Sequence, residues 1–224
     1  MIPFLNHLLD WRARLRLYVG VAIFLFCLSW ILVFLRAQLL NRDINIIISD
    51  ARGYYLYLPS IVIDGDLDFS NQLQAHREPL LLESGGTEYS VLNKYPIGLA
   101  LTLLPTFVVA HTFSITAHTL TGQAWLAPDG YSFIYQFLAV AMVMVAGLAT
   151  MMIIDQTIVR CFEVDGRIAC AAIFAYWIGS HYLYYFFREP LMVHVVSTFW
   201  VVLVLYLCNK GASQKRWWHY PFLT

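Results

Sequence analysis

Charged residues are scarce in this chain. Lysine, arginine, aspartate and glutamate make up 12% of its 224 residues, whereas hydrophobic residues make up 60%. Soluble globular proteins carry about a quarter of their residues as charged side chains. The composition therefore predicts an all-α, polytopic helical membrane protein. The net charge is zero and no basic tract with interleaved aromatic residues occurs, which argues against nucleic acid as a partner.

The usual sequence motifs of soluble enzymes are also missing. The four cysteines include no Cys-x-x-Cys pair, so they indicate neither a disulfide framework nor a zinc site. No GxSxG, P-loop, GxGxxG or HExxH motif occurs anywhere in the chain. Candidate functional residues must therefore be sought among the charges that lie beside the apolar segments.

Five apolar segments approach the roughly 20 residues that a spanning helix needs. They cover residues 17–35, 96–117, 131–157, 168–187 and 191–207. Together they predict a single transmembrane domain over residues 1–224. Its expected parts are an interfacial N-terminus (1–16), a first span (17–35), an outer loop (43–95), the remaining helices (96–207) and a basic tail (208–224).

The charges on either side of these segments bear on topology. Arginines before the first segment predict an uncleaved anchor with a cytoplasmic N-terminus. Five simple crossings would then place Arg160, Arg167 and the basic tail outside, against the positive-inside tendency. If the segment 96–117 dips in and returns, or an extra crossing lies near it, these charges become cytoplasmic and Arg188 faces the same side as Asp50. We favour this second arrangement.

The predicted outer loop holds most of the polar chemistry, with eight carboxylates against three basic side chains between Asp43 and Lys94. Acids gathered beside a bilayer indicate a polar substrate or a cation. Asp50 follows an apolar run, and partial burial there would raise its pKa towards the range useful for a general base or a ligand of a divalent metal cation. The alternative is an N-cap for a helix that begins at Ala51.

Three aspartates alternate at positions 64, 66 and 68 and suggest a calcium loop. The EF-hand pattern fails, because Gly65 stands at the second place instead of the sixth and Ala75 replaces the bidentate glutamate. We therefore favour a solvated turn with capping aspartates.

Other polar residues near the apolar segments are candidates for substrate binding. Lys94 precedes an apolar segment, where its ammonium group would hold a lipid phosphate or simply reach the interface. Arg188 and Glu189 lie between two apolar segments, a setting in which charges are functional by default, although the two could neutralise each other. Tyr54 and Tyr55 belong to a segment suited to a helix in the headgroup layer.

These motifs together resemble one enzyme family. The outer loop opens with SDARGYYLYLPS, continues through DGDLDFSN and closes with NKYPIGLALTLLP. A charged FFREP turn follows the fourth apolar segment. This pattern resembles bacterial GT-C glycosyltransferases, in particular the branch that includes protein O-mannosyltransferases and lipid A aminoarabinose transferases. The likeness covers mainly residues 44–115 and 168–200.

The resemblance implies a function and roles for individual residues. It implies transfer of a sugar from a polyprenyl-phosphate carrier to a lipid, glycan or protein acceptor at the outer face of the bacterial inner membrane. Asp50 would be the catalytic residue, Lys94 and Arg188 would bind the carrier phosphate, and Asp50 with Glu189 would hold a metal cation if one is used. Tyr95 departs from the family pattern, because it separates the lysine from Pro96.

Family members are usually about twice as long, so the resemblance predicts that this chain is the N-terminal portion of such an enzyme. The alternative function is a non-enzymatic membrane component, such as a subunit of a lipid-carrier flippase, a scaffold or an inactive fragment. Such a component would use the same charges to bind phosphate.

Overall fold

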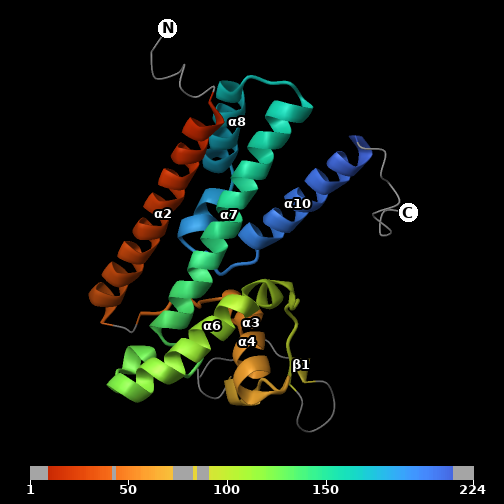
Figure 1. Cartoon of the computed structure of the whole chain (residues 1–224). Helices are drawn as coiled ribbons and strands as arrows, with labels where there is room; N and C mark the ends of the chain where they lie inside the picture. The colour runs from red at the N-terminus through yellow and green to blue at the C-terminus, as the bar shows by residue number, and fades with distance from the viewer. Residues whose placement is uncertain (1–9, 42–43, 73–82, 85–90, 214–224) are drawn as a thin grey trace. The chain divides into compact units, whose positions relative to one another are not determined.

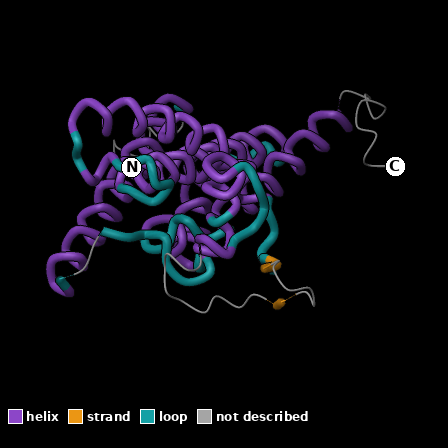
Figure 2. Tube along the Cα trace, turned by 90° about the horizontal axis from the view of Figure 1, so that it is seen from below, coloured by secondary structure: helices purple, strands orange, loops and turns teal. Residues whose placement is uncertain are grey.

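The computed structural model describes residues 10–41, 44–72, 83–84 and 91–213, which are helical over most of their length (Figure 1). Two strands of two residues each, β1 (Glu83–Ser84) and β2 (Val91–Leu92), form one antiparallel pair (Figure 2). The prediction of a helical fold is confirmed for these residues.

Three helices are long and apolar enough to cross a membrane. They are α2 (Trp11–Leu40), α6 (Gly98–Thr121) and α7 (Phe133–Cys161). Helix α6 continues through Pro105 without interruption. The helices that follow are shorter, namely α8 (Gly166–Gly179), α9 (Tyr182–Phe187) and α10 (His194–Ser213). Five spans are therefore not confirmed.

The fourth apolar segment is divided into two helices. Helix α8 ends at Gly179, and Ser180 adopts an extended conformation with φ −123°. The Ser180 hydroxyl then accepts a hydrogen bond from the backbone N–H of Tyr182 at 3.2 Å, at the start of α9. Glycine and serine favour such boundaries, because glycine is a poor helix former and serine satisfies free N–H groups. Apolarity alone did not reveal this break.

The helices at the two ends of the described chain are longer than the predicted apolar segments. Residues 1–9 of the predicted interfacial segment lie outside the described residues, and its remainder belongs mostly to α2, which already begins at Trp11. The predicted basic tail lies outside the described residues from position 214, whereas residues 208–213 end α10.

The chain divides into two compact units. The first contains the described parts of residues 1–27, 144–188 and 194–224, and the second contains those of residues 28–143 and 189–193.

In the first unit, the beginning of α2 lies against the end of α7. Arg14 donates from Nε and Nη2 to both carboxylate oxygens of Asp155, at 2.9 and 3.1 Å, and the Tyr18 hydroxyl donates to Oδ1 of the same carboxylate at 2.8 Å. Arg14 is 3% exposed and Asp155 is 0% exposed. Since Arg14 lies near the start of α2 and Asp155 near the end of α7, the two helices are antiparallel there.

A glycine on α7 allows a close aromatic contact in the same unit. A Cβ atom at Gly147 would lie 2.0 Å from Cε2 of Phe186, so the ring packs directly on the helix backbone. The Phe186 ring also lies 4.6 Å from that of Trp177 on α8, measured between centroids. Both aromatic side chains are buried, and they join α7, α8 and α9.

In the second unit, short helices and turns follow α2 and α6 along the chain. They are α3 (Ala51–Tyr55), α4 (Tyr57–Pro59), the π-helical turn η1 (Ser60–Asp64) and the 3₁₀ turn η2 (Ala124–Leu126). Phe107 on α6 packs against Tyr55 and against Tyr135 on α7, with ring centroids 6.0 and 5.0 Å apart. These aromatic contacts fix α3 against α6 and the beginning of α7.

Candidate functional site

Asp50 occupies the N-cap position of α3, but its side chain makes no capping hydrogen bond. Instead, the Tyr95 hydroxyl donates a hydrogen bond of 2.6 Å to Oδ1 of Asp50. Asp50 is exposed, so the expected partial burial is wrong. Oδ2 of Asp50 accepts no hydrogen bond from the described residues.

Tyr95 is held against the α3–α4 region by one direct hydrogen bond and by two that run through Asn93. Its backbone carbonyl accepts a hydrogen bond of 2.6 Å from the Tyr57 hydroxyl. Its backbone N–H donates to Oδ1 of Asn93, and Nδ2 of Asn93 donates to the Gly53 carbonyl, at 3.0 and 2.6 Å. The segment before α6 is thereby tied to α3, which fixes the direction of the Tyr95 side chain.

The Tyr95 ring lies directly on the backbone of α3. A Cβ atom at Gly53 would come within 1.9 Å of Cδ2 of Tyr95. The ring also meets Tyr54 edge to face, with centroids 4.8 Å apart. Burial first, and then the hydrogen bond to Asp50, raise the pKa of Tyr95 to about 12. The phenol therefore remains a proton donor to Asp50 at neutral pH.

Lys94 lies over the same aromatic ring. Its Nζ is 5.1 Å from the centroid of the Tyr95 ring, within the range of a cation–π contact. Tyr95 thus joins three residues that the sequence singled out, Asp50, Tyr54 and Lys94, in one exposed site. A carboxylate, an ammonium group and two phenols in one exposed site can bind a phosphorylated polar substrate and accept a proton.

Tyr55 is 1% exposed and belongs to the core of the second unit. Its hydroxyl donates to the Gly130 carbonyl at 2.9 Å, and its ring lies 5.8 Å from that of Tyr131. Burial raises the pKa of Tyr55 well above the ordinary value. This placement gives Tyr55 a packing role, and its predicted contact with substrate stays a prediction.

The alternating aspartates form the expected turn. Asp66 accepts from the backbone N–H of Asp68 at 3.1 Å, and Asp68 accepts from that of Ser70 at 3.0 Å. Gly65, with φ 77°, ends the π-helical turn before them. Bonding of Asp68 to Ser70 lowers the pKa of that carboxyl group. The interpretation as capping aspartates is confirmed.

Arg188 and Glu189 fall on either side of the boundary between the units. Arg188 caps the end of α9 in the first unit, where its N–H donates to the Tyr184 carbonyl at 2.8 Å. The Glu189 carbonyl accepts from the N–H of Met192 at 3.0 Å and begins the turn that leads to α10. Both side chains are half-buried. Their proposed roles in phosphate and metal binding stay predictions.

A metal site is not assembled by the described part of the chain. No three histidine, cysteine, aspartate or glutamate side chains gather there in a way that could hold an ion. Asp50 and Glu189 therefore stay a hypothetical pair of ligands, and no chemical step is derived through a metal.

Two groups of polar residues were not predicted from the sequence. The first is centred on Tyr95, and the only sign of it in the sequence was that Tyr95 departs from the family pattern. The other is formed by His181 and His194, whose rings lie 5.7 Å apart, with the Tyr185 ring 4.0 Å from that of His194. They precede α9 and begin α10, so only the turn between these helices brings them together.

Comparison with protein-family models, with curated proteins and with solved structures finds no match for this chain.

Proposed function

We propose that this chain acts as part of a GT-C-like glycosyltransferase in the bacterial inner membrane. It would transfer a sugar from a polyprenyl-phosphate carrier to an acceptor at the outer face. The observation that carries the proposal is that Tyr95 contacts both the exposed Asp50 carboxylate and the Lys94 ammonium group. A base and a phosphate-binding cation on one surface are the two groups that this reaction needs.

In the proposed reaction, the acceptor hydroxyl oxygen attacks the anomeric carbon of the sugar. The bond between that carbon and the carrier phosphate oxygen breaks, and the carrier leaves as a polyprenyl phosphate. Oδ2 of Asp50 takes the proton of the acceptor hydroxyl, while Oδ1 keeps the hydrogen bond from Tyr95. Lys94 would stabilise the negative charge that develops on the phosphate.

The contact between α2 and α7 supports the topology that this function requires. The start of α2 and the end of α7 meet at the Arg14–Asp155 ion pair, so these two ends lie on the same side if both helices cross. The chain between them must then make an even number of crossings. Since α6 is the one helix between them in the described chain that is long and apolar enough, it would lie along the surface or return.

This arrangement assigns each charged segment to one side of the membrane. The N-terminus, Arg160 and Arg167 would be cytoplasmic, in agreement with the positive-inside tendency. Asp50 and Lys94 would face outwards. If α8 and α9 make one crossing together, Arg188 faces outwards as well.

The substitution Asp50→Asn tests the proposed base. We expect it to lower sugar transfer from the polyprenyl-phosphate carrier by about 10²- to 10⁴-fold, the usual contribution of a general base. Asp68→Asn is the matched control, because it makes the same change at an exposed aspartate of the same loop. The measurement is incorporation of labelled sugar into acceptor in membranes that contain the complete protein, together with binding of the carrier.

The outcomes separate the two candidate functions. Unchanged transfer by the Asp50→Asn variant would refute the proposed base. A wild-type protein that binds the carrier in a Lys94-dependent way but transfers no sugar would favour the non-enzymatic component.

A further inference from the structure

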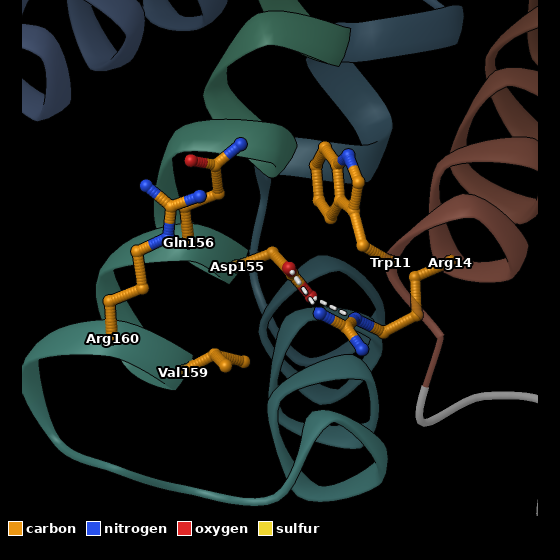
Figure 3. A pocket seen from close by; sticks show the side chains of 6 residues that line it. All are labelled: Trp11, Arg14, Asp155, Gln156, Val159 and Arg160. Atoms are coloured by element: carbon orange, nitrogen blue, oxygen red, sulfur yellow. Dashed lines mark hydrogen bonds and ion pairs between the residues drawn. The ribbon is translucent and has the colours of Figure 1, made fainter.

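A pocket of about 230 Å³ opens in the first unit beside the buried ion pair. It is lined by Trp11 and Arg14 from α2 and by Asp155, Gln156, Val159 and Arg160 from α7 (Figure 3). A water molecule takes up about 30 Å³ in the liquid, so the pocket has room for a polar group of several heavy atoms. This pocket contains none of the residues proposed for sugar transfer.

The pocket carries a net positive charge. Asp155 is fully buried, and both its oxygens accept hydrogen bonds, from Arg14 and from Tyr18. Figure 3 shows Arg14 directed at this carboxylate. The Asp155 charge is therefore already balanced, and the remaining charge of the lining is that of Arg160.

Arg160 is exposed, and its side chain has no hydrogen bond or ion pair among the described residues. The acids that follow it along the chain do not neutralise it. Asp165 pairs with Arg167 at 3.0 Å, and Glu163 lies in an exposed turn with φ 53°. At the start of the facing helix, the exposed charges near Arg14 are those of Asp10, Arg12 and Arg16, which together are positive. The Arg160 guanidinium group therefore lines the pocket and can bind an anion.

The pocket lies where two apolar helices end. Trp11 is the first residue of α2, and Arg160 is in the last turn of α7. Tryptophan is enriched at membrane–water interfaces, and basic pockets between membrane helices bind lipid headgroups. A group bound here would meet three side chains of the lining. The guanidinium of Arg160 suits a phosphate, the amide of Gln156 suits the phosphate oxygens, and the indole of Trp11 suits the adjoining glycerol.

We propose that this pocket binds the phosphate headgroup of an anionic phospholipid from the leaflet on the side of the N-terminus. The apolar surfaces of α2 and α7 next to the pocket would then contact the acyl chains, which a soluble phosphate ion lacks. The proposal concerns a lipid site in the first unit and is independent of the proposed sugar transfer.

The substitution Arg160→Gln tests the site. The complete chain is purified in a mild detergent, and binding of phosphatidylglycerol, phosphatidylcholine and inorganic phosphate is measured by native mass spectrometry and titration. A basic residue near a lipid surface contributes enough that its loss weakens binding about fivefold. We expect that loss for phosphatidylglycerol and little change for phosphatidylcholine.

Arg16→Gln is the matched control, because it removes the same charge from an exposed arginine on α2 that does not line the pocket. Affinity for phosphatidylglycerol should stay at the wild-type level. Arg14 is left intact, since its loss would leave Asp155 buried without a cation.

Three results would overturn the proposal. Equal losses in the two variants would mean diffuse attraction of anionic lipid instead of a site. An unchanged affinity in Arg160→Gln would exclude the guanidinium as a ligand. Inorganic phosphate that binds as tightly as phosphatidylglycerol, and depends on Arg160, would assign the pocket to a soluble anion.

Discussion

The substitution Gly53→Ala should dismantle the candidate site without touching any residue proposed for chemistry. The new methyl group would lie 1.9, 2.2 and 2.7 Å from Cδ2, Cε2 and Cγ of the Tyr95 ring. Non-bonded carbon atoms prefer separations of about 3.5–4.0 Å, so the ring must move away from α3. Because Tyr95 is only half-buried, we expect the side chain to swing outwards and release Asp50.

The cost follows from the contacts that the ring would lose. The hydrogen bond to Asp50 is exposed and contributes about 1 kcal/mol, near the middle of the usual range for hydrogen bonds. The edge-to-face pair with Tyr54 contributes about 0.5–1.5 kcal/mol. The sum of about 2 kcal/mol agrees with the roughly 1–3 kcal/mol typical of adding a methyl group to a packed site.

The pKa of the Tyr95 phenol reports this movement directly. Burial and the Asp50 carboxylate both raise this pKa, to about 12 in the wild type, so loss of both contacts lowers it towards the ordinary value of 10.0. The assay is a pH titration of the ring signal of labelled tyrosine by NMR. In Asp50→Asn the pKa should fall only part of the way, since burial is the larger cause.

Gly98→Ala is the control for Gly53→Ala. It makes the same change in the same unit, and no heavy atom lies within 4 Å of the new Cβ position. The reasoning fails if both variants keep the pKa of Tyr95 at the wild-type value, because the ring would then have tolerated the methyl group in place.

Two further predictions concern the first unit and the topology. Asp155→Asn should destabilise the protein by about 3–5 kcal/mol, because Arg14 would keep a buried charge without a counter-charge. Thermal unfolding measures this, and Asp165→Asn, at the half-buried pair with Arg167, should cost much less. Equally small effects of the two substitutions would show that the Arg14–Asp155 pair is not buried. The topology is tested with the single substitutions Asp66→Cys, Gln123→Cys and Phe162→Cys in a cysteine-free background. The first two should be labelled from the outer side of the membrane and the third from the cytoplasm. Labelling of Gln123→Cys from the cytoplasm would mean that α6 crosses the membrane.

The helices were predictable from sequence where the apolar runs were long and uninterrupted. The segment expected over residues 131–157 corresponds to α7, and that over 96–117 to α6, with the end of each helix a few residues further on. The prediction of one continuous helix over residues 168–187 was wrong, because a hydropathy average does not register the turn at Gly179 and Ser180. The backbone preferences of glycine and serine end the helix there although the sequence stays apolar.

The candidate site was predictable in its charges but not in its geometry. Asp50 and Lys94 stood out because charges beside apolar segments are rare in this chain. Their connection through Tyr95 depends on a close approach of segments that lie far apart in sequence, which Gly53 permits by having no side chain. A single glycine within a tyrosine-rich stretch carries no signal of such a contact until the partner ring is known.

The Arg14–Asp155 pair could not be predicted from the sequence for a different reason. In the sequence each charge has an ordinary explanation, since arginines precede a first span and an aspartate ends an apolar run. In the structure the two charges neutralise each other, which fixes the register of α2 against α7. A shift of one helical turn, about 5.4 Å, would separate the two groups and leave both charges unpaired at a cost of several kcal/mol. Because this pairing occupies Arg14, the cation left to the pocket is Arg160, so the anion binding proposed for the pocket depends on the Arg14–Asp155 ion pair.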